Sequence, residues 1–188
     1  MTTNAEWNEI KPLPKVTCTS SDCERDLHTF LRVRPGPESY RSGPCRVCGS
    51  NLVDWKRLDR HDLRDVENTM HSLRQEYVRH HYWDIGIDQK AINHARRKGV
   101  SGLREAADHR LRKYVAPPRS VNSWDGRQTP KTGNVIFYAQ HATATCCRRC
   151  LEAWHGIPRE RSLTDEELGY MREMVMYYID QRLPFLTE

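Results

Sequence analysis

The sequence predicts an α-rich α+β protein in two parts. A small zinc ribbon is expected over residues 1–58, followed by a helical domain over residues 59–188 with a short strand region and a second Cys/His metal site. Three observations lead to this prediction. Two cysteine pairs lie near the N-terminus, apolar residues recur at helical spacing, and a dense run of cysteines and histidines follows a short apolar stretch near residue 140.

The two N-terminal cysteine pairs have spacings that are typical of zinc ligands. Within each pair the intervening residues form a short turn, which directs both sulfur atoms toward one tetrahedral centre. The expected ligands of this first zinc ion are Cys18, Cys23, Cys45 and Cys48. Strands are expected beside the pairs, over residues 27–33 and 51–55. Because four protein ligands leave no open coordination position, the expected role of the ion is structural.

Most of the remaining chain is expected to be helical. Between residues 60 and 82, apolar side chains recur every three or four residues and form one stripe on a helix. A second helix is expected from Asp88 to Lys98, where Gly99 stops it, and a third over residues 103–115. Thr164 begins a capping box that predicts a last helix, ended by Pro184.

The stretch from Tyr138 to Ile157, YAQHATATCCRRCLEAWHGI, contains three of the seven cysteines and two of the nine histidines. The apolar run before it, residues 135–139, predicts a strand, and a short helix is expected to end near Gly156. Residues three or four apart share one helix face, so pairs of these thiols can lie side by side. The expected ligands of a second zinc ion are His141, Cys147, Cys150 and His155, with Cys146 as a spare or substitute.

This stretch resembles an uncharacterised bacterial family whose hallmark is the run AQHATATCC-x-x-CL-x-x-WHGI, present here from Ala139 to Ile157. The resemblance covers about residues 88–183. The sequence departs from the family pattern at several positions. Trp124 and Arg127 stand where the family usually has Asn and Lys, and Ala106-Ala107 stands where an upstream helix often carries His-Ala. The N-terminal cysteine pairs are an addition to that pattern. The resemblance implies no particular activity.

Several kinds of chemistry are open at the second site. One is a closed structural zinc site. Another is a catalytic zinc ion with three protein ligands and a water molecule, for which Asp125 or His141 would act as the base. A redox role is suggested by the Cys147-x-x-Cys150 spacing, although the alternating strand–helix pattern of thioredoxin-like folds is missing. An iron–sulfur cluster is less favoured than zinc, because it would require a fourth thiolate ligand.

Charge is unevenly distributed, although the formal net charge is only +5. Residues 90–119 contain nine basic and two acidic residues, whereas residues 160–188 contain three basic and seven acidic residues. Several cations on one surface would bind nucleic acid through its phosphates. The candidate nucleic-acid-binding residues are Arg96, Arg97, Lys98, Arg110, Arg112 and Lys113. The acidic C-terminal helix is a candidate face for a protein partner.

The chain has no feature of a membrane or secreted protein. No apolar run approaches the ~20 residues of a membrane helix, and the first residues lack the apolar segment of a secretion signal. The seven cysteines are an odd number with ligand-like spacing, which argues against a disulfide framework. We therefore expect a cytoplasmic protein with reduced cysteines.

Together these observations predict a zinc-binding cytosolic protein that engages nucleic acid through its basic helices. A metal-dependent hydrolase or nuclease that acts at the second site is the alternative. A third class is a zinc-stabilised scaffold or complex subunit.

Overall fold

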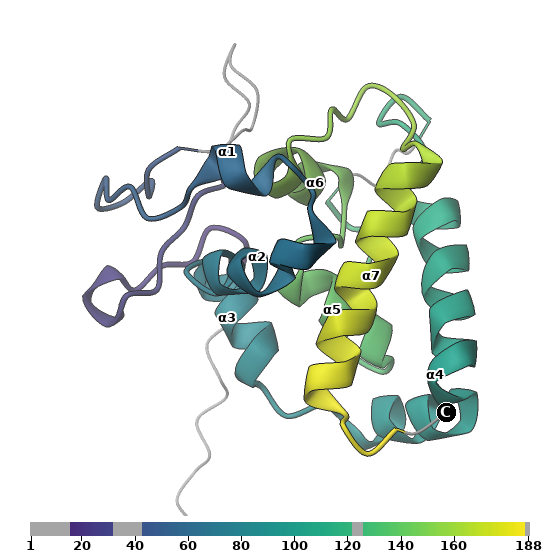
Figure 1. Cartoon of the computed structure of the whole chain (residues 1–188). Coiled ribbons are helices and arrows are strands. Elements are labelled where there is room, and N and C mark those ends of the chain that lie inside the picture. Colours follow the sequence, from purple (N-terminus) through teal and green to yellow (C-terminus); the bar gives the residue numbers. More distant parts are fainter. Residues whose placement is uncertain (1–15, 32–42, 122–125, 187–188) are drawn as a thin grey trace, which may run out of the picture.

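The computed structural model describes residues 16–31, 43–121 and 126–186. Within these ranges the protein is rich in helices and has almost no strand structure (Figure 1). The α-helices are α1 (Trp55–Leu58), α2 (Val66–Leu73), α3 (Tyr77–Asp84), α4 (Gln89–Arg110), α5 (Val135–Ala142), α6 (Arg148–His155) and α7 (Asp165–Arg182). The shorter turns are η1 (Cys23–Arg25) and η2 (Leu63–Asp65), both 3-10, and the π-helical η3 (Leu111–Val115). None of the helices in the described ranges has the length and apolar content needed to span a membrane.

Helix α5 lies at the centre of the core and packs against α3, α4 and α7 (Figure 1). Most of its side chains are buried, among them Val135, Ile136 and Ala139. The predicted strand over residues 135–139 is therefore wrong. The Asn134 side chain accepts a hydrogen bond from the N–H of Ile136 (3.0 Å) and begins a helix there. A short apolar run that is buried on all sides has no periodicity that distinguishes a strand from a helix.

The apolar stripe of residues 60–82 is divided among η2, α2 and α3 instead of forming one helix. Between α2 and α3 the backbone pairs with the N-terminal segment. The N–H of His28 donates to the carbonyl oxygen of Gln75 (2.8 Å), and the N–H of Tyr77 donates to that of His28 (2.9 Å). These bonds form a parallel bridge between His28 and Glu76. The helix is interrupted because its backbone groups bind another segment at this point.

Strand structure in the described residues is limited to that bridge and to an antiparallel bridge between Asp22 and Leu27. The expected strand over residues 27–33 does not form in its described part. Residues 51–54 are irregular, and α1 follows at Trp55. The helix-rich part of the predicted fold class is thus confirmed, whereas turns and helices replace the expected strands.

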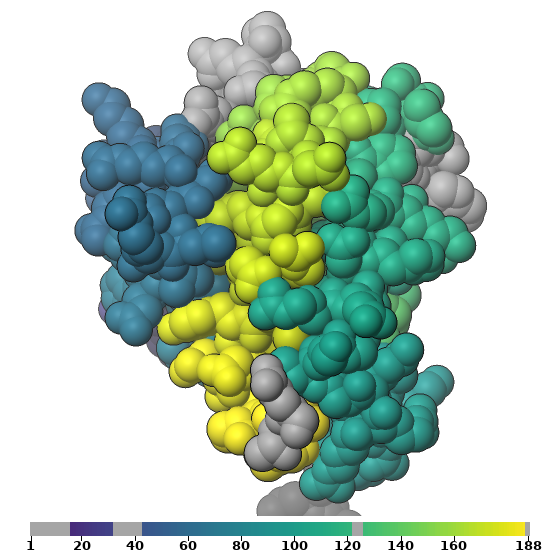
Figure 2. All heavy atoms as spheres, turned by 45° about the vertical axis from the view of Figure 1, so that its right-hand side comes forward, coloured from purple at the N-terminus to yellow at the C-terminus, as the bar shows by residue number. Residues whose placement is uncertain are grey.

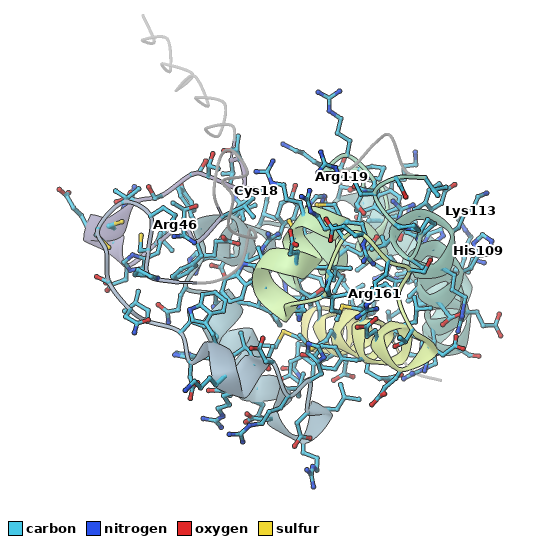
Figure 3. All side chains as sticks on the ribbon, turned by 90° about the horizontal axis from the view of Figure 1, so that it is seen from above. Cys18, Arg46, His109, Lys113, Arg119 and Arg161 are labelled. Carbon is cyan, nitrogen blue, oxygen red and sulfur yellow. The ribbon has the colours of Figure 1, made fainter. Side chains whose placement is uncertain are left out.

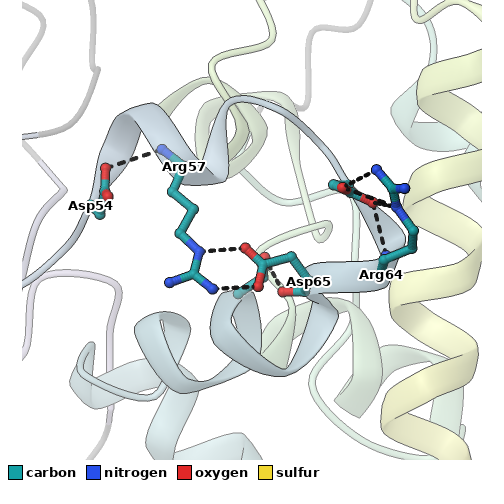
Figure 4. Close-up of polar contacts among 6 residues, drawn as sticks. Asp54, Arg57, Arg64 and Asp65 are labelled. Carbon is teal, nitrogen blue, oxygen red and sulfur yellow. Dashed lines mark hydrogen bonds and ion pairs between the residues drawn. The ribbon is translucent and has the colours of Figure 1, made fainter.

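Charged side chains hold the connection between α1 and α2 (Figure 4). Asp54 caps α1 by accepting a hydrogen bond from the N–H of Arg57 (3.1 Å). The guanidinium of Arg57 then binds both carboxylate oxygens of Asp65, at the start of α2. Beside it, Arg64 pairs with Asp62 at 2.8 Å. All of these groups face solvent at least in part, so each pair contributes little to stability by itself.

The expected helix boundaries around α4 are confirmed. Asp88 accepts a hydrogen bond from the N–H of Ala91 (2.9 Å) and caps the helix. Gly99 has φ +64° and ψ 177°, which interrupts the helical backbone. The second half continues from there into η3. Because this backbone conformation is almost restricted to glycine, Gly99 fixes the position of the kink.

Helix α7 starts with the predicted capping box. The Thr164 side chain accepts from the N–H of Glu167 (3.1 Å), and the Glu167 carboxylate accepts from the N–H of Thr164 (2.9 Å). Figure 2 shows α7 along the surface, between α4 on one side and the segment of α1 and α2 on the other. Its inner face, which includes Met171 and Val175, is fully buried. The helix therefore joins the N-terminal and central parts of the fold.

Candidate metal centres

The first cluster consists of Cys23, His28, Cys45 and Cys48, whose ligand atoms all lie within 4.8 Å of one another. The Cys23 and Cys45 sulfurs are 3.8 Å apart, and the Cys48 sulfur lies 3.4 Å from Nδ1 of His28. In a tetrahedral zinc site with Zn–S of about 2.3 Å and Zn–N of about 2.0–2.1 Å, the corresponding edges are about 3.8 and 3.6 Å. These two distances are close to the edges of such a tetrahedron, so the four side chains could hold a metal ion.

The surroundings of the first cluster favour the ionised form of Cys45. Burial opposes its ionisation, but backbone N–H groups of Cys48, Thr29 and Val47 point at the sulfur and lower the pKa of Cys45 to about 6. Burial also lowers the pKa of His28, yet hydrogen bonds to two of the thiols outweigh that effect and leave the pKa above its usual value. A turn whose N–H groups stabilise a thiolate is prepared for a cation.

One predicted ligand of this site is replaced. The structure places Cys18 outside the first cluster, and His28 supplies the fourth ligand atom. Cysteine spacing identified Cys23, Cys45 and Cys48 but could not show which side chain completes the group. The available signal was His28 itself, because a histidine a few residues after a ligand cysteine is a common zinc pair.

The second cluster consists of Cys146, Cys147 and Cys150, whose sulfurs also lie within 4.8 Å of one another. Their exposed fractions are 3%, 4% and 1%. Ala144, at φ +57°, turns the chain between α5 and α6, and Cys147 is the N-cap residue of α6. Cys150 lies in the first turn. A helix N-terminus favours negative charge and therefore the thiolate form.

The three thiols of the second cluster are hydrogen-bonded to one another. Contacts with Cys147 and Cys150 hold the pKa of Cys146 well below its usual value. Contacts with Cys146 and Cys150, together with burial, raise the pKa of Cys147 well above it. Without a cation the group can therefore hold one thiolate easily but not three, because buried like charges repel.

A buried ion pair lies beside the second cluster. Glu76 and Arg79 are both fully buried, with Nε and Oε2 2.9 Å apart. The guanidinium donates to the sulfur of Cys150 (3.2 Å), while the carboxylate accepts from the indole N–H of Trp154 (2.8 Å) and the backbone N–H of Phe30 (3.3 Å). A chain of hydrogen bonds thus runs from the segment that carries the first cluster to the second cluster.

The two histidines predicted as ligands of the second site lie outside the second cluster. His141 stacks on Tyr82 with ring centroids 4.5 Å apart, and its Nε2 donates to the carbonyl oxygen of Pro130 (3.1 Å). His155 donates from Nε2 to the carbonyl oxygen of Thr143 (2.9 Å). Burial lowers the pKa of His141 to about 4 and that of His155 to about 3, so both rings are neutral near pH 7. Cys146, expected as a spare or substitute, lies in the cluster in their place.

The other predicted catalytic residue, Asp125, lies outside the described residues. The loop end that follows it contacts the interior at Thr129. The hydroxyl of Thr129 donates to the carbonyl oxygen of Cys146 (2.8 Å). This bond orients the backbone at the second cluster.

The predicted nucleic-acid-binding residues are in different environments. Arg110 is half-buried, and its guanidinium donates to the side chain of Gln140 and to the carbonyl oxygen of Gln128, both at 2.7 Å. Arg112 pairs with Asp108 and Asp165, both at 2.8 Å. The remaining four are exposed: Arg96, Arg97, Lys98 and Lys113. In Figure 3, Lys113 and Arg46 lie at opposite ends of the molecule.

The fold and the two clusters define a helix-rich protein with Cys/His groups that could hold metal ions. Residues 67–180 match the family model described as a domain of unknown function, DUF4186. Because this match spans more than half of the chain, the protein belongs to the DUF4186 family. The expected membership of an uncharacterised family is thereby confirmed. No solved structure matches the chain.

Proposed function

We propose that this is a zinc protein in which one bound ion stabilises the N-terminal segment and a second stabilises the turn before α6. The observation that supports this most strongly is the first cluster, with three thiols and one imidazole at the edge distances of a zinc tetrahedron. Thiolate and imidazole ligands favour zinc over magnesium or calcium. Four protein ligands leave no open position, so the role proposed for this ion is structural.

The second cluster is proposed as a second zinc site. Its three thiols need a cation to ionise together, and the Arg79 guanidinium donates to Cys150 at 3.2 Å, as groups around metal-bound sulfur commonly do. The three cysteine residues are 1–4% exposed. A hydrolase or nuclease would need a coordination position that substrate can reach, and such burial gives that alternative little support.

The proposal is tested by zinc analysis of protein purified under reducing conditions and passed over a mild chelator. Two equivalents of zinc are expected. Cys45→Ser and Cys147→Ser should each lower the content to one equivalent, from different sites. Val47→Ala, in the same turn as Cys45 but 65% exposed, should retain both. Wild-type protein without stoichiometric zinc would overturn the proposal.

Nucleic-acid binding is a second candidate function. It is supported by Arg96, Arg97 and Lys98, which are adjacent and exposed in the last turn before the α4 kink. It is weakened by the intramolecular contacts of Arg110 and Arg112. Fluorescence anisotropy at low salt should show binding to duplex or single-stranded nucleic acid, with an affinity that falls as salt rises.

A charge-reversed pair separates this surface from general charge effects. Arg97→Glu with Lys98→Glu should weaken binding and flatten its salt dependence. Lys56→Glu, at an exposed position on α1, should have less effect. Absence of binding to any DNA or RNA at low salt would remove nucleic acid as a partner.

A further inference from the structure

The second cluster offers three ligands where a tetrahedral zinc ion takes four. The two histidines predicted to complete it, His141 and His155, use Nε2 for hydrogen bonds to carbonyl oxygens. The missing ligand must therefore come from elsewhere in the fold or from solvent. At the second cluster, where the sulfurs are almost inaccessible, a protein side chain is the better source.

Cys18 lies beside this group of thiols. Its thiol is close enough to that of Cys150 for a side-chain hydrogen bond, although Cys18 is not one of the three thiols that all lie within 4.8 Å of one another. The backbone around it is anchored on both sides. The Thr29 hydroxyl donates to the Cys18 carbonyl oxygen (3.3 Å), and the Lys131 ammonium donates to the carbonyl oxygen of Val16 (3.5 Å).

Several groups at the second cluster interact electrostatically with the Cys18 thiol. Its charge acts on Cys146, on His141 and on the hydroxyl of Tyr82. Cys18 is also partly buried against the hydrophobic core. Figure 3 shows Cys18 between Arg46, which lies in the segment of the first cluster, and the helices of the rest of the protein. The residue thus lies beside the second cluster, although it precedes the first cluster in the sequence.

We propose that Cys18 is the fourth ligand of the second metal site, which is then a four-cysteine zinc centre made of Cys18, Cys146, Cys147 and Cys150. This inference rests on the proposed function. It assigns Cys18, which the first site does not use, to a metal site whose other ligands lie in the region that matches the family model. The first site, with Cys23, His28, Cys45 and Cys48, is complete without it.

Charge and geometry agree with a mononuclear zinc ion. Four thiolates and one zinc ion carry a net charge of −2, which is costly in a buried site unless donors surround the sulfurs. Arg79 supplies such donors, with Nη2 at 3.2 Å from Cys150 and Nη1 at 4.0 Å from Cys146. A four-iron cluster would distribute its thiolates over four separate irons. Three sulfurs within 4.8 Å of one another suit a single centre.

The assignment has a thermodynamic consequence. Cys18 and the other three ligands lie far apart in the sequence, so the ion closes a loop that contains most of the chain. A cross-link of that size removes much conformational entropy from the unfolded state, as a long-loop disulfide does. Metal at the second site would therefore stabilise the attachment of the N-terminal segment as well as α6.

Zinc content of paired variants tests the assignment directly. In the presence of a mild chelator, Cys18→Ser should retain one equivalent of zinc. Cys18→Ser combined with Cys147→Ser should also retain one, because both act on the same ion. Cys18→Ser combined with Cys23→Ser should retain none. Ser20→Ala, which removes the side chain bonded to the Thr17 N–H (3.0 Å) in the same turn, should keep both ions.

The opposite pattern would overturn the inference. If Cys18 belonged to the first site, its pairing with Cys23→Ser would leave one ion and its pairing with Cys147→Ser would leave none. Two ions retained by Cys18→Ser would show that it is no ligand. Wild-type protein without zinc would instead refute the proposed function, so the two failures are distinguishable.

A measurement on wild-type protein covers the case in which the variants do not fold. Iodoacetamide labelling followed by peptide mass spectrometry reports each cysteine separately. Cys18 should be protected in the zinc-bound protein and should become reactive together with Cys150 as chelator is added. Release of Cys18 together with Cys23, before Cys150, would contradict the assignment.

Discussion

Glu76 and Arg79 link the two clusters through side-chain hydrogen bonds. Both are completely buried, and between them they contact the N-terminal backbone at Phe30, the indole of Trp154 and the sulfur of Cys150. A buried ion pair adds little net stability compared with apolar residues, but removal of one partner leaves an uncompensated charge. This pair therefore orients the Phe30 backbone, the Trp154 indole and the Cys150 thiol, and its removal should disturb the structure at both clusters.

Replacement of Arg79 by Met should lower the free energy of unfolding by about 3–5 kcal/mol, because the Glu76 carboxylate loses its buried partner. Urea unfolding followed by tryptophan fluorescence measures this change. Combining it with Glu76→Gln should recover part of the loss. Arg64→Met, which removes an exposed pair with Asp62 (Figure 4), should have no resolvable effect. Equal effects of Arg79→Met and Arg64→Met would contradict this account.

His155 should make stability depend on pH. Burial lowers its pKa from 6.5 to about 3, so the unfolded chain takes up a proton below pH 6.5 that the folded chain does not. Stability from this residue is therefore complete above about pH 6.5 and falls as pH decreases toward 3, by about 1.4 kcal/mol per pH unit. His155→Gln keeps a donor for the Thr143 carbonyl but does not titrate.

The measurement is the difference in unfolding free energy between wild type and His155→Gln at several values between pH 7 and pH 5. The difference should shrink as pH falls. Loss of metal at acid pH affects both proteins in the same way, so it cancels in the comparison. A difference that is independent of pH would show that the ring is already protonated or not buried.

Helix ends were predictable, whereas the type of some elements was not. The caps at Asp88 and Thr164 depend on residues next to each helix, and the structure confirms both. The interruption between α2 and α3 depends on His28, which lies far away in the sequence and binds the backbone at Gln75. Local patterns cannot contain that information. Helix α5 was missed because its faces are almost all apolar.

The kink in α4 provides a test at this scale. Gly99→Ala should destabilise the protein by about 1–2 kcal/mol, because φ +64° with ψ 177° is strained for any residue with a Cβ. Gly169→Ala, inside α7 with open space around the new methyl group, should instead stabilise it by about 0.5–1 kcal/mol. Thermal or urea unfolding of both variants measures the signs. A stabilised Gly99→Ala protein would show that α4 runs straight.

Over the whole molecule, the basic middle and the acidic C-terminal part neutralise each other. Arg104 pairs with Glu173, and Arg112 in η3 pairs with Asp165 at 2.8 Å. A pair of the opposite sense joins Arg172 to Asp108 at 3.1 Å. These contacts join α4 and η3 to α7 along the face seen in Figure 2. Charge counts along the sequence suggested one surface for polyanions and another for a partner. The ion pairs show that part of this charge serves the packing of these helices.

Sequence spacing located both clusters but not their membership. The sequence placed Cys23, Cys45 and Cys48 in one group and predicted a second group between Tyr138 and Ile157, where Cys146, Cys147 and Cys150 lie together. His28 was visible in the sequence as a possible ligand, but spacing could not choose between it and Cys18, because both lie within one short segment and the fold decides which side chain joins the first cluster. His141 and His155 lie close to the cysteines in the sequence and were therefore predicted as ligands. In the structure each donates a hydrogen bond from Nε2 to a backbone carbonyl oxygen.

Metal removal should affect the entire molecule. Binding of structural zinc is coupled to folding, so its loss removes that free energy from the native state. A loss of about 5 kcal/mol would lower Tm by roughly 10–20 °C for a chain of this size. Differential scanning calorimetry before and after chelation measures the shift. Zinc should restore the original Tm and magnesium should not, and an unchanged Tm after complete chelation would contradict the structural role.

The parallel bridge between His28 and Glu76 also limits how the protein can be dissected. The family match starts at residue 67, but an excised piece with that boundary would lack the strand-like contact for Gln75 and Tyr77 and the Phe30 amide for Glu76. Its surface would expose the carboxylate of Glu76 and the indole of Trp154, which are buried in the whole protein. We therefore expect the shortest fragment that folds by itself to begin before residue 67.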